Sequence, residues 1–133
     1  MNFKFETYFP HPKIRTTQSE SIQKILDAYV NKGKRYVVLE AGTGVGKSAI
    51  GMTVSRYMNN NVDTSFSEEH SEGTYFLTTQ KILQEQYVKD FGKPRGKMCS
   101  IKSSSNYQCS YHKKNTCQES QRLPQDYSPL KNN

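Results

Sequence analysis

The sequence predicts an α/β fold, in which helices flank a parallel β-sheet. Helical and strand patterns alternate between residues 15 and 91, in the order helix, strand, helix, strand, helix. A glycine-rich turn lies between the first predicted strand and the second predicted helix. This order is typical of a βαβ unit, whose two strands run parallel. With only two strands predicted, the unit corresponds to part of a sheet and leaves one parallel edge unpaired.

The first predicted helix follows an aromatic lead-in, residues 1–14, that we expect to be extended. Thr17 and Glu20 have the spacing of a capping box, which satisfies two backbone N–H groups at a helix start. Apolar residues then recur at helical spacing and form one stripe. The stripe consists of Ile22, Ile25, Leu26 and Tyr29. The helix is expected to end at residues 31–34.

The remaining elements follow from short apolar runs and their periods. Residues 36–39 form a continuous, β-branched run that predicts a buried strand, and residues 74–78 predict a second strand. Residues 47–58 and 81–91 predict two more helices, separated by a polar loop at 59–73. The buried side of the middle helix is expected to carry Ile50, Val54, Tyr57 and Met58.

Length and charge restrict the class of protein. The chain has 133 residues, which is enough for one domain. No stretch approaches the roughly 18 apolar residues that a membrane-spanning helix needs, and residues 1–10 lack the apolar core of a secretory signal. We therefore expect no membrane partner and a location in the cytoplasm, the host's if the gene is viral. The abundance of Lys, Asn, Ile and Tyr is consistent with a phage gene.

The basic charge is concentrated at one end of the chain. Residues 1–91 carry 11 Lys and Arg against 10 Asp and Glu, whereas residues 92–133 carry 8 against 2. We accordingly divide the chain into an α/β part, 1–91, and a poorly structured basic segment, 92–133. A basic, polar segment favours contact with nucleic acid, although a merely solvated tail has the same composition.

The glycine-rich turn matches the phosphate-binding loop pattern G-x-x-x-x-G-K-[ST], with Ala41 in place of the first Gly. Glycines allow backbone N–H groups to surround a phosphate. The Lys ammonium would neutralise the β- and γ-phosphates of ATP, and the Ser48 hydroxyl would bind Mg²⁺. The ATP-binding residues predicted from this loop are Gly42, Thr43, Gly44, Val45, Gly46, Lys47 and Ser48.

The segment from Glu40 to Ser48 resembles the E-A-x-T-G-x-G-K-[ST] form of superfamily 2 helicases, especially the iron–sulfur group typified by XPD and DinG. Residues 15–18 (RTTQ) are similar to the R-x-x-Q element of that group. The resemblance implies a partial RecA-like, DEAD/DEAH-type ATP-binding domain in which Arg15 and Gln18 contribute to the nucleotide site. There the Gln amide reads the adenine edge. Alternatively, Gln18 is an ordinary exposed residue of a first helical turn.

Residues 75–87 resemble helicase motif Ia, in which a strand ends in Thr residues that contact the phosphates of single-stranded nucleic acid. The resemblance implies that Thr78, Thr79 and Gln80 bind single-stranded DNA, which suits hydroxyl donors at a helix N-terminus. The alternative is that Thr78 and Thr79 only cap the helix that begins at Lys81.

Three cysteines lie in the basic segment. Residues 106–109 (NYQC) are similar to the segment that carries the first cluster cysteine of the DinG-like helicases, which implies a [4Fe–4S] cluster held by Cys109, Cys117 and Cys99. A fourth ligand would have to lie beyond residue 133. The alternatives are a zinc site that adds His112 to the three cysteines, or plain free thiols.

No catalytic residue is identifiable, because no strand ends in the acidic D-E-x-[HD] pattern that would hold Mg²⁺ and orient water. Residues 68–70 (EEH) lie in a polar loop and are a poor substitute. We therefore interpret the chain as the N-terminal, ATP-binding portion of a longer DNA helicase, expected to bind ATP weakly and not to unwind DNA alone. A small P-loop phosphotransferase and a non-enzymatic nucleic-acid-binding remnant are the alternatives.

Overall fold

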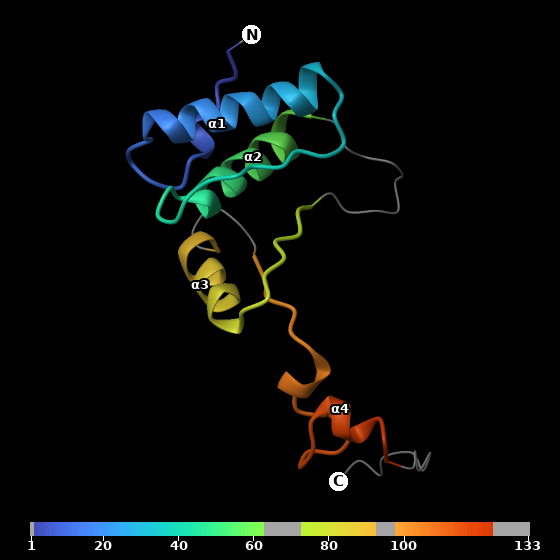
Figure 1. The fold of residues 1–133 in the computed structure, drawn as a ribbon. Helices are drawn as coiled ribbons and strands as arrows, with labels where there is room; N and C mark the ends of the chain where they lie inside the picture. Colours follow the sequence, from blue (N-terminus) through green and yellow to red (C-terminus); the bar gives the residue numbers. More distant parts are fainter. Residues whose placement is uncertain (1, 63–72, 93–97, 124–133) are drawn as a thin grey trace. The chain divides into compact units, whose positions relative to one another are not determined.

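The computed structural model describes residues 2–62, 73–92 and 98–123, which fall into two compact units, Met1–Leu77 and Thr78–Asn133 (Figure 1). Unit 1 contains the elements η1 (Glu6–Tyr8), α1 (Thr16–Leu26), η2 (Asp27–Asn31) and α2 (Lys47–Asn61). Unit 2 contains α3 (Lys81–Phe91), η3 (Ser104–Asn106) and α4 (Cys117–Ser120). The boundary between the units lies after Leu77, whereas the change in charge and composition lies after Phe91.

The core of unit 1 lies between α1, α2 and the N-terminal segment, which are neighbours in Figure 1. Phe5, Ile22 and Leu26 are completely buried, and Ile50 is buried to within 1%. The aromatic lead-in is therefore part of the core, because Phe3, Phe5 and Phe9 supply three of its large side chains. This role was not predicted, although Phe3 and Phe5 alternate with charged residues at a period of two.

A glutamine of α1 fixes the N-terminal segment in place. The Gln23 side chain accepts a hydrogen bond from the Phe3 N–H (3.0 Å) and donates one to the Phe3 carbonyl (2.8 Å). One amide thus satisfies both backbone groups of a residue whose own side chain is buried. The bond explains how an irregular segment can contribute aromatic rings to the core.

The three predicted helices are confirmed, with one correction to a helix start. The α1 helix begins at Thr16, with Arg15 as its N-cap, and the Gln18 side chain accepts the Arg15 N–H (3.0 Å). The predicted capping box between Thr17 and Glu20 is wrong, because Thr17 already lies inside the first turn, where its carbonyl accepts the Ser21 hydroxyl. The α2 and α3 helices begin at the expected Lys47 and Lys81.

The described residues contain no β-strand, only one isolated bridge, so the parallel sheet stays a prediction. Both segments predicted as strands nevertheless alternate in exposure as strands do. Val37, Leu39 and Phe76 line an apolar groove against α2, whereas their neighbours point to solvent. The most exposed of these neighbours are Tyr36 (83%), Val38 (94%), Tyr75 (86%) and Leu77 (92%).

Unit 2 has one buried large side chain among its described residues, Phe91 of α3. Residues 98–123 are folded by short turns: η3, an antiparallel bridge between Gln108 and Thr116, and α4. The Thr116 and Glu119 side chains form a reciprocal capping box at the start of α4. No helix in the part of the chain that the structure describes is both long and apolar enough to cross a membrane.

Candidate nucleotide-binding site

Two left-handed glycines shape the loop that precedes α2. Gly44 has φ 77° and Gly46, the N-cap residue of α2, has φ 85°. Residues with a Cβ atom rarely adopt these angles. The Gly46 carbonyl accepts the N–H groups of Ala49 and Ile50, so the helix begins directly at the loop. The loop therefore lies against the positive end of the α2 dipole, where an anion is stabilised.

The predicted phosphate-binding lysine lies over this loop. Lys47 Nζ donates to the carbonyl oxygens of Ala41 (3.0 Å) and Gly42 (2.9 Å). The ammonium is exposed, so phosphate oxygens that approach the loop can replace either carbonyl as its acceptor. Ser48, the predicted Mg²⁺ ligand, is the second residue of α2 and carries its hydroxyl on the same first turn.

Two residues from the start of α1 hold the loop from the other side. Arg15 Nη1 donates to the Gly44 carbonyl (3.0 Å), and Gln18 Nε2 donates to the Val45 carbonyl (2.9 Å). The structure thus brings Arg15 and Gln18 to the glycine-rich loop, 27 to 29 residues away in sequence. The signal in the sequence was the R-x-x-Q element, which predicted the site but not these carbonyl partners.

Gln18 is 5% exposed, so the alternative of an exposed first-turn residue is wrong. A Cβ atom at Gly46 would overlap with Gln18 Nε2. Gly46 therefore meets two demands at once: a left-handed backbone and a close approach of the Gln18 amide. The amide oxygen of Gln18 accepts the Arg15 N–H, and its amide nitrogen donates to the Val45 carbonyl. Adenine recognition by Gln18 stays a prediction.

The residues predicted to contact nucleic acid lie in unit 2, at the start of α3. The Thr78 hydroxyl accepts the Gln80 N–H (3.4 Å), and Gln80 is the N-cap residue of α3. Gln80 makes no side-chain capping bond, and Thr79 and Gln80 are exposed. The structure thus places all three residues at one helix N-terminus, where phosphate contact is chemically favourable.

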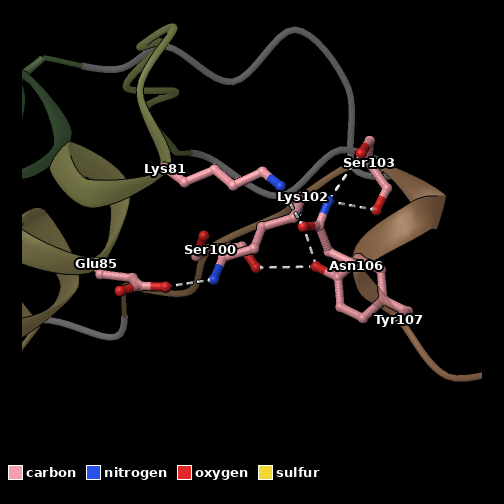
Figure 2. Close-up of polar contacts among 7 residues, drawn as sticks. All are labelled: Lys81, Glu85, Ser100, Lys102, Ser103, Asn106 and Tyr107. Atoms are coloured by element: carbon pink, nitrogen blue, oxygen red, sulfur yellow. Dashed lines mark hydrogen bonds and ion pairs between the residues drawn. The ribbon is translucent and has the colours of Figure 1, made fainter.

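Asn106 and Tyr107, which carry the resemblance to the cysteine segment of DinG-like helicases, have structural roles in unit 2 (Figure 2). Asn106 Oδ1 accepts Lys81 Nζ of α3 (2.6 Å), and its Nδ2 donates to the Ser103 hydroxyl (2.8 Å). The Tyr107 hydroxyl accepts the Lys102 N–H (2.9 Å). Lys102 Nζ forms an ion pair with Glu85 of α3 (2.7 Å), and this contact lowers the pKa of the Glu85 carboxyl.

The cysteines do not form a metal site in the structure. Among residues 2–62, 73–92 and 98–123, no three Cys, His, Asp or Glu side chains are grouped so that they could hold a metal ion. The structure therefore does not bring together the residues of the zinc alternative (Cys99, Cys109, His112 and Cys117), and the [4Fe–4S] cluster is unsupported. Cys109 Sγ instead accepts the His112 N–H (3.3 Å), and Cys117 Sγ donates to the Gln108 carbonyl (3.7 Å).

Cys99, Cys109 and Cys117 form no disulfide. The hydroxyl of Ser120 and then the backbone N–H of His112 lower the pKa of the Cys109 thiol. Both are donors that stabilise a thiolate. The physical consequence is that Cys109 is hydrogen-bonded into its own loop rather than directed at a shared ligand.

A glycine-rich loop, a helix N-terminus, and a lysine and hydroxyl on the first turn are typical of P-loop nucleotide-binding proteins. The chain belongs to the family described as type III restriction enzyme, res subunit, whose model matches residues 11–126. Membership indicates a superfamily 2 helicase-like, ATP-dependent enzyme of nucleic acid, with ATP and Mg²⁺ as the expected nucleotide and metal. No curated protein and no solved structure is significantly similar to the chain.

Proposed function

We propose that this chain is the ATP-binding portion of a superfamily 2 DNA helicase of the XPD/DinG-like type. The observation that carries the proposal is that side chains from both α2 and the start of α1 donate hydrogen bonds to the carbonyls of the phosphate-binding loop. Lys47 Nζ donates to the Ala41 and Gly42 carbonyls, while Arg15 and Gln18 donate to the carbonyls of Gly44 and Val45. A loop whose carbonyls are held in this way directs its N–H groups toward a bound anion.

The roles of the site residues follow from their chemistry. The loop N–H groups and Lys47 would bind the β- and γ-phosphates of ATP, and the Ser48 hydroxyl would ligate Mg²⁺. Thr78, Thr79 and Gln80 would contact the backbone of single-stranded DNA. The two apolar segments at 36–39 and 74–78 would be strands of a parallel, RecA-like sheet.

No acidic residue is assigned to catalysis. The only acidic candidates that the sequence offered, at 68–70, lie outside the described residues. We therefore propose that the 133-residue chain binds ATP and single-stranded DNA without unwinding a duplex. Efficient strand separation by the purified chain would contradict this part of the proposal.

Equilibrium binding of a fluorescent ATP analogue with Mg²⁺ tests the nucleotide site. Lys47→Ala removes a charge-assisted contact worth about 1.5–3 kcal/mol, so the dissociation constant should rise roughly 10- to 150-fold. Lys34→Ala is the matched control, because Lys34 is also an exposed lysine of unit 1. Equal affinities for the wild type and Lys47→Ala would show that Lys47 and its loop do not bind the nucleotide. That result would favour a non-enzymatic nucleic-acid-binding protein.

A second measurement separates a helicase from a small phosphotransferase. Single-stranded DNA should change the affinity for the ATP analogue if the site belongs to a helicase. A nucleoside monophosphate should leave that affinity unchanged. The opposite pattern would favour the phosphotransferase.

A further inference from the structure

The segment between the bridge residues Gln108 and Thr116 is a closed loop with a basic, aromatic tip. Residues 109–115 (CSYHKKN), which we call the Tyr111 loop, include Tyr111, Lys113 and Lys114 as exposed residues. None of these residues is used by the nucleotide site. The loop belongs to the strongly basic end of the chain, which has 8 Lys and Arg against 2 Asp and Glu after residue 91.

The backbone of the loop is fixed by its own hydrogen bonds. The Cys109 N–H donates to the Asn115 carbonyl (2.9 Å), and the Asn115 N–H donates to the His112 carbonyl (2.9 Å). The Gln108 side chain donates to the Lys113 carbonyl, and the His112 N–H donates to Cys109 Sγ. Little backbone conformational entropy therefore remains to be lost when the tip binds a ligand.

The side chains at the tip have the chemistry of a single-strand binding site. The Tyr111 ring is 44% exposed and packs edge-on against His112, with ring centroids 4.7 Å apart. Two ammonium groups follow it directly in the chain, at Lys113 and Lys114. A tyrosine that offers stacking area, next to cations that bind phosphates, is the combination by which proteins hold single strands without reading sequence.

The base of the loop is tied to the helix that starts with the predicted DNA contacts. The Cys117 N–H donates to the Tyr107 carbonyl (2.8 Å), and the neighbouring Asn106 accepts Lys81 Nζ (2.6 Å), as Figure 2 shows for the latter pair. Lys81 directly follows Gln80. The Tyr111 loop and the N-terminus of α3 are therefore parts of one hydrogen-bonded unit.

We propose that the Tyr111 loop is a second contact for single-stranded DNA, with a base stacked on Tyr111 and phosphates bound by Lys113 and Lys114. The inference rests on the nucleic-acid substrate of the proposed function and adds a site to it. Binding of an acidic protein would use the charges of Lys113 and Lys114 but would not require the exposed Tyr111 ring. A membrane surface would need more apolar area than one tyrosine among polar neighbours supplies.

The absence of Trp from the 133-residue chain permits a direct test of stacking in the whole chain. Tyr111→Trp introduces a single indole, whose fluorescence should be quenched when an oligo(dT) strand is added. Tyr36→Trp is the control, because Tyr36 is 83% exposed and lies in unit 1. Binding of oligo(dT) by Tyr111→Trp without quenching of its indole would overturn the stacking contact.

Anisotropy of labelled oligo(dT) then measures the contribution of the loop. Tyr111→Ala should weaken binding about tenfold, whereas Tyr111→Phe, which keeps the ring, should bind as the wild type does. Lys113→Ala/Lys114→Ala should make the slope of log affinity against log salt shallower by about 1.4, because two phosphate contacts are lost. Lys24→Ala/Lys34→Ala changes the net charge equally and should leave the slope nearly unchanged.

The outcomes separate this inference from the proposed function. If the wild-type chain does not bind oligo(dT), the nucleic-acid part of the proposed function fails, and the loop proposal fails with it. If the wild type binds and the loop variants bind equally well, only the loop proposal is overturned. Loss of binding in the lysine variant but not in Tyr111→Ala would overturn the stacked base and indicate a charge-only site, such as one for an acidic protein.

Discussion

The two units of the chain are stabilised by different interactions. Unit 1 buries aromatic and aliphatic side chains around α1 and α2, and Phe5 and Leu26 are completely inaccessible. Unit 2 buries one large apolar side chain among its described residues, and its segments are joined mainly by side-chain hydrogen bonds such as that of Asn106. Hydrophobic burial is cooperative over many residues, whereas exposed polar contacts contribute little each. Substitutions should therefore affect the whole of unit 1 but only parts of unit 2.

The largest effect is expected from a core truncation in unit 1. Phe5→Ala removes a fully buried ring and should lower the free energy of unfolding by about 3–5 kcal/mol, measured by urea denaturation followed by circular dichroism. Val38→Ala, at a side chain 94% exposed, should change it by less than about 0.5 kcal/mol. A loss below 1 kcal/mol for Phe5→Ala would mean that the aromatic segment does not belong to the core.

The next effect concerns the contact between the glycine-rich loop and α1. Gly46→Ala and Gly44→Ala both place a Cβ at a left-handed φ, which costs about 1–2 kcal/mol each. Only Gly46→Ala also creates a steric clash with the Gln18 amide, since nothing lies within 4 Å of a Cβ at Gly44. Gly46→Ala should therefore weaken binding of the ATP analogue more than Gly44→Ala does.

Adding Gln18→Ala tests the cause of that difference. Gly46→Ala should weaken binding of the analogue less in a Gln18→Ala background than in the wild type, because the clash is absent there. Equal affinities for the two single glycine variants would show that the Gln18 contact has no influence on the loop.

In unit 2 we expect a local effect. Asn106→Ala removes the acceptor of Lys81 and the donor to Ser103, which together contribute about 1–2 kcal/mol. Amide hydrogen exchange should accelerate in residues 98–123 and stay unchanged in α2. Asn106→Asp keeps the acceptor for Lys81 and should show a smaller change; acceleration in α2 would contradict the separation of the two units.

The smallest effect is a dependence on pH. Lys102 lowers the pKa of Glu85 below its usual 4.5, so the carboxylate form is favoured in the folded protein. Its contribution to stability is present above pH 4.5 and is lost as the pH falls through the lowered pKa. In Lys102→Gln the pKa of Glu85, followed by NMR titration, should move back toward 4.5. An unchanged titration would show that the ion pair does not form in solution.

Features with local causes could be predicted from the sequence, whereas contacts between distant residues could not. The starts of α2 and α3 were predicted because a glycine or polar turn precedes an apolar helical period, and both signals are local. The burial of Phe3, Phe5 and Phe9 was not predicted, because it depends on packing against residues distant in sequence, such as Ile22, Leu26 and Ile50. Spacing in the chain likewise did not show that Cys99, Cys109 and Cys117 would not be grouped in the structure.

The sequence by itself determined the nucleotide-binding loop, since left-handed glycines, a lysine and a hydroxyl before a helix have local causes. It also determined the concentration of positive charge after residue 91. Only the tertiary structure decided that the Gln18 amide lies under Gly46 and holds the Val45 carbonyl. Likewise, only the structure showed that Cys109 is hydrogen-bonded within the Tyr111 loop. Such contacts join groups that are adjacent only after the chain has packed, and no local propensity specifies them.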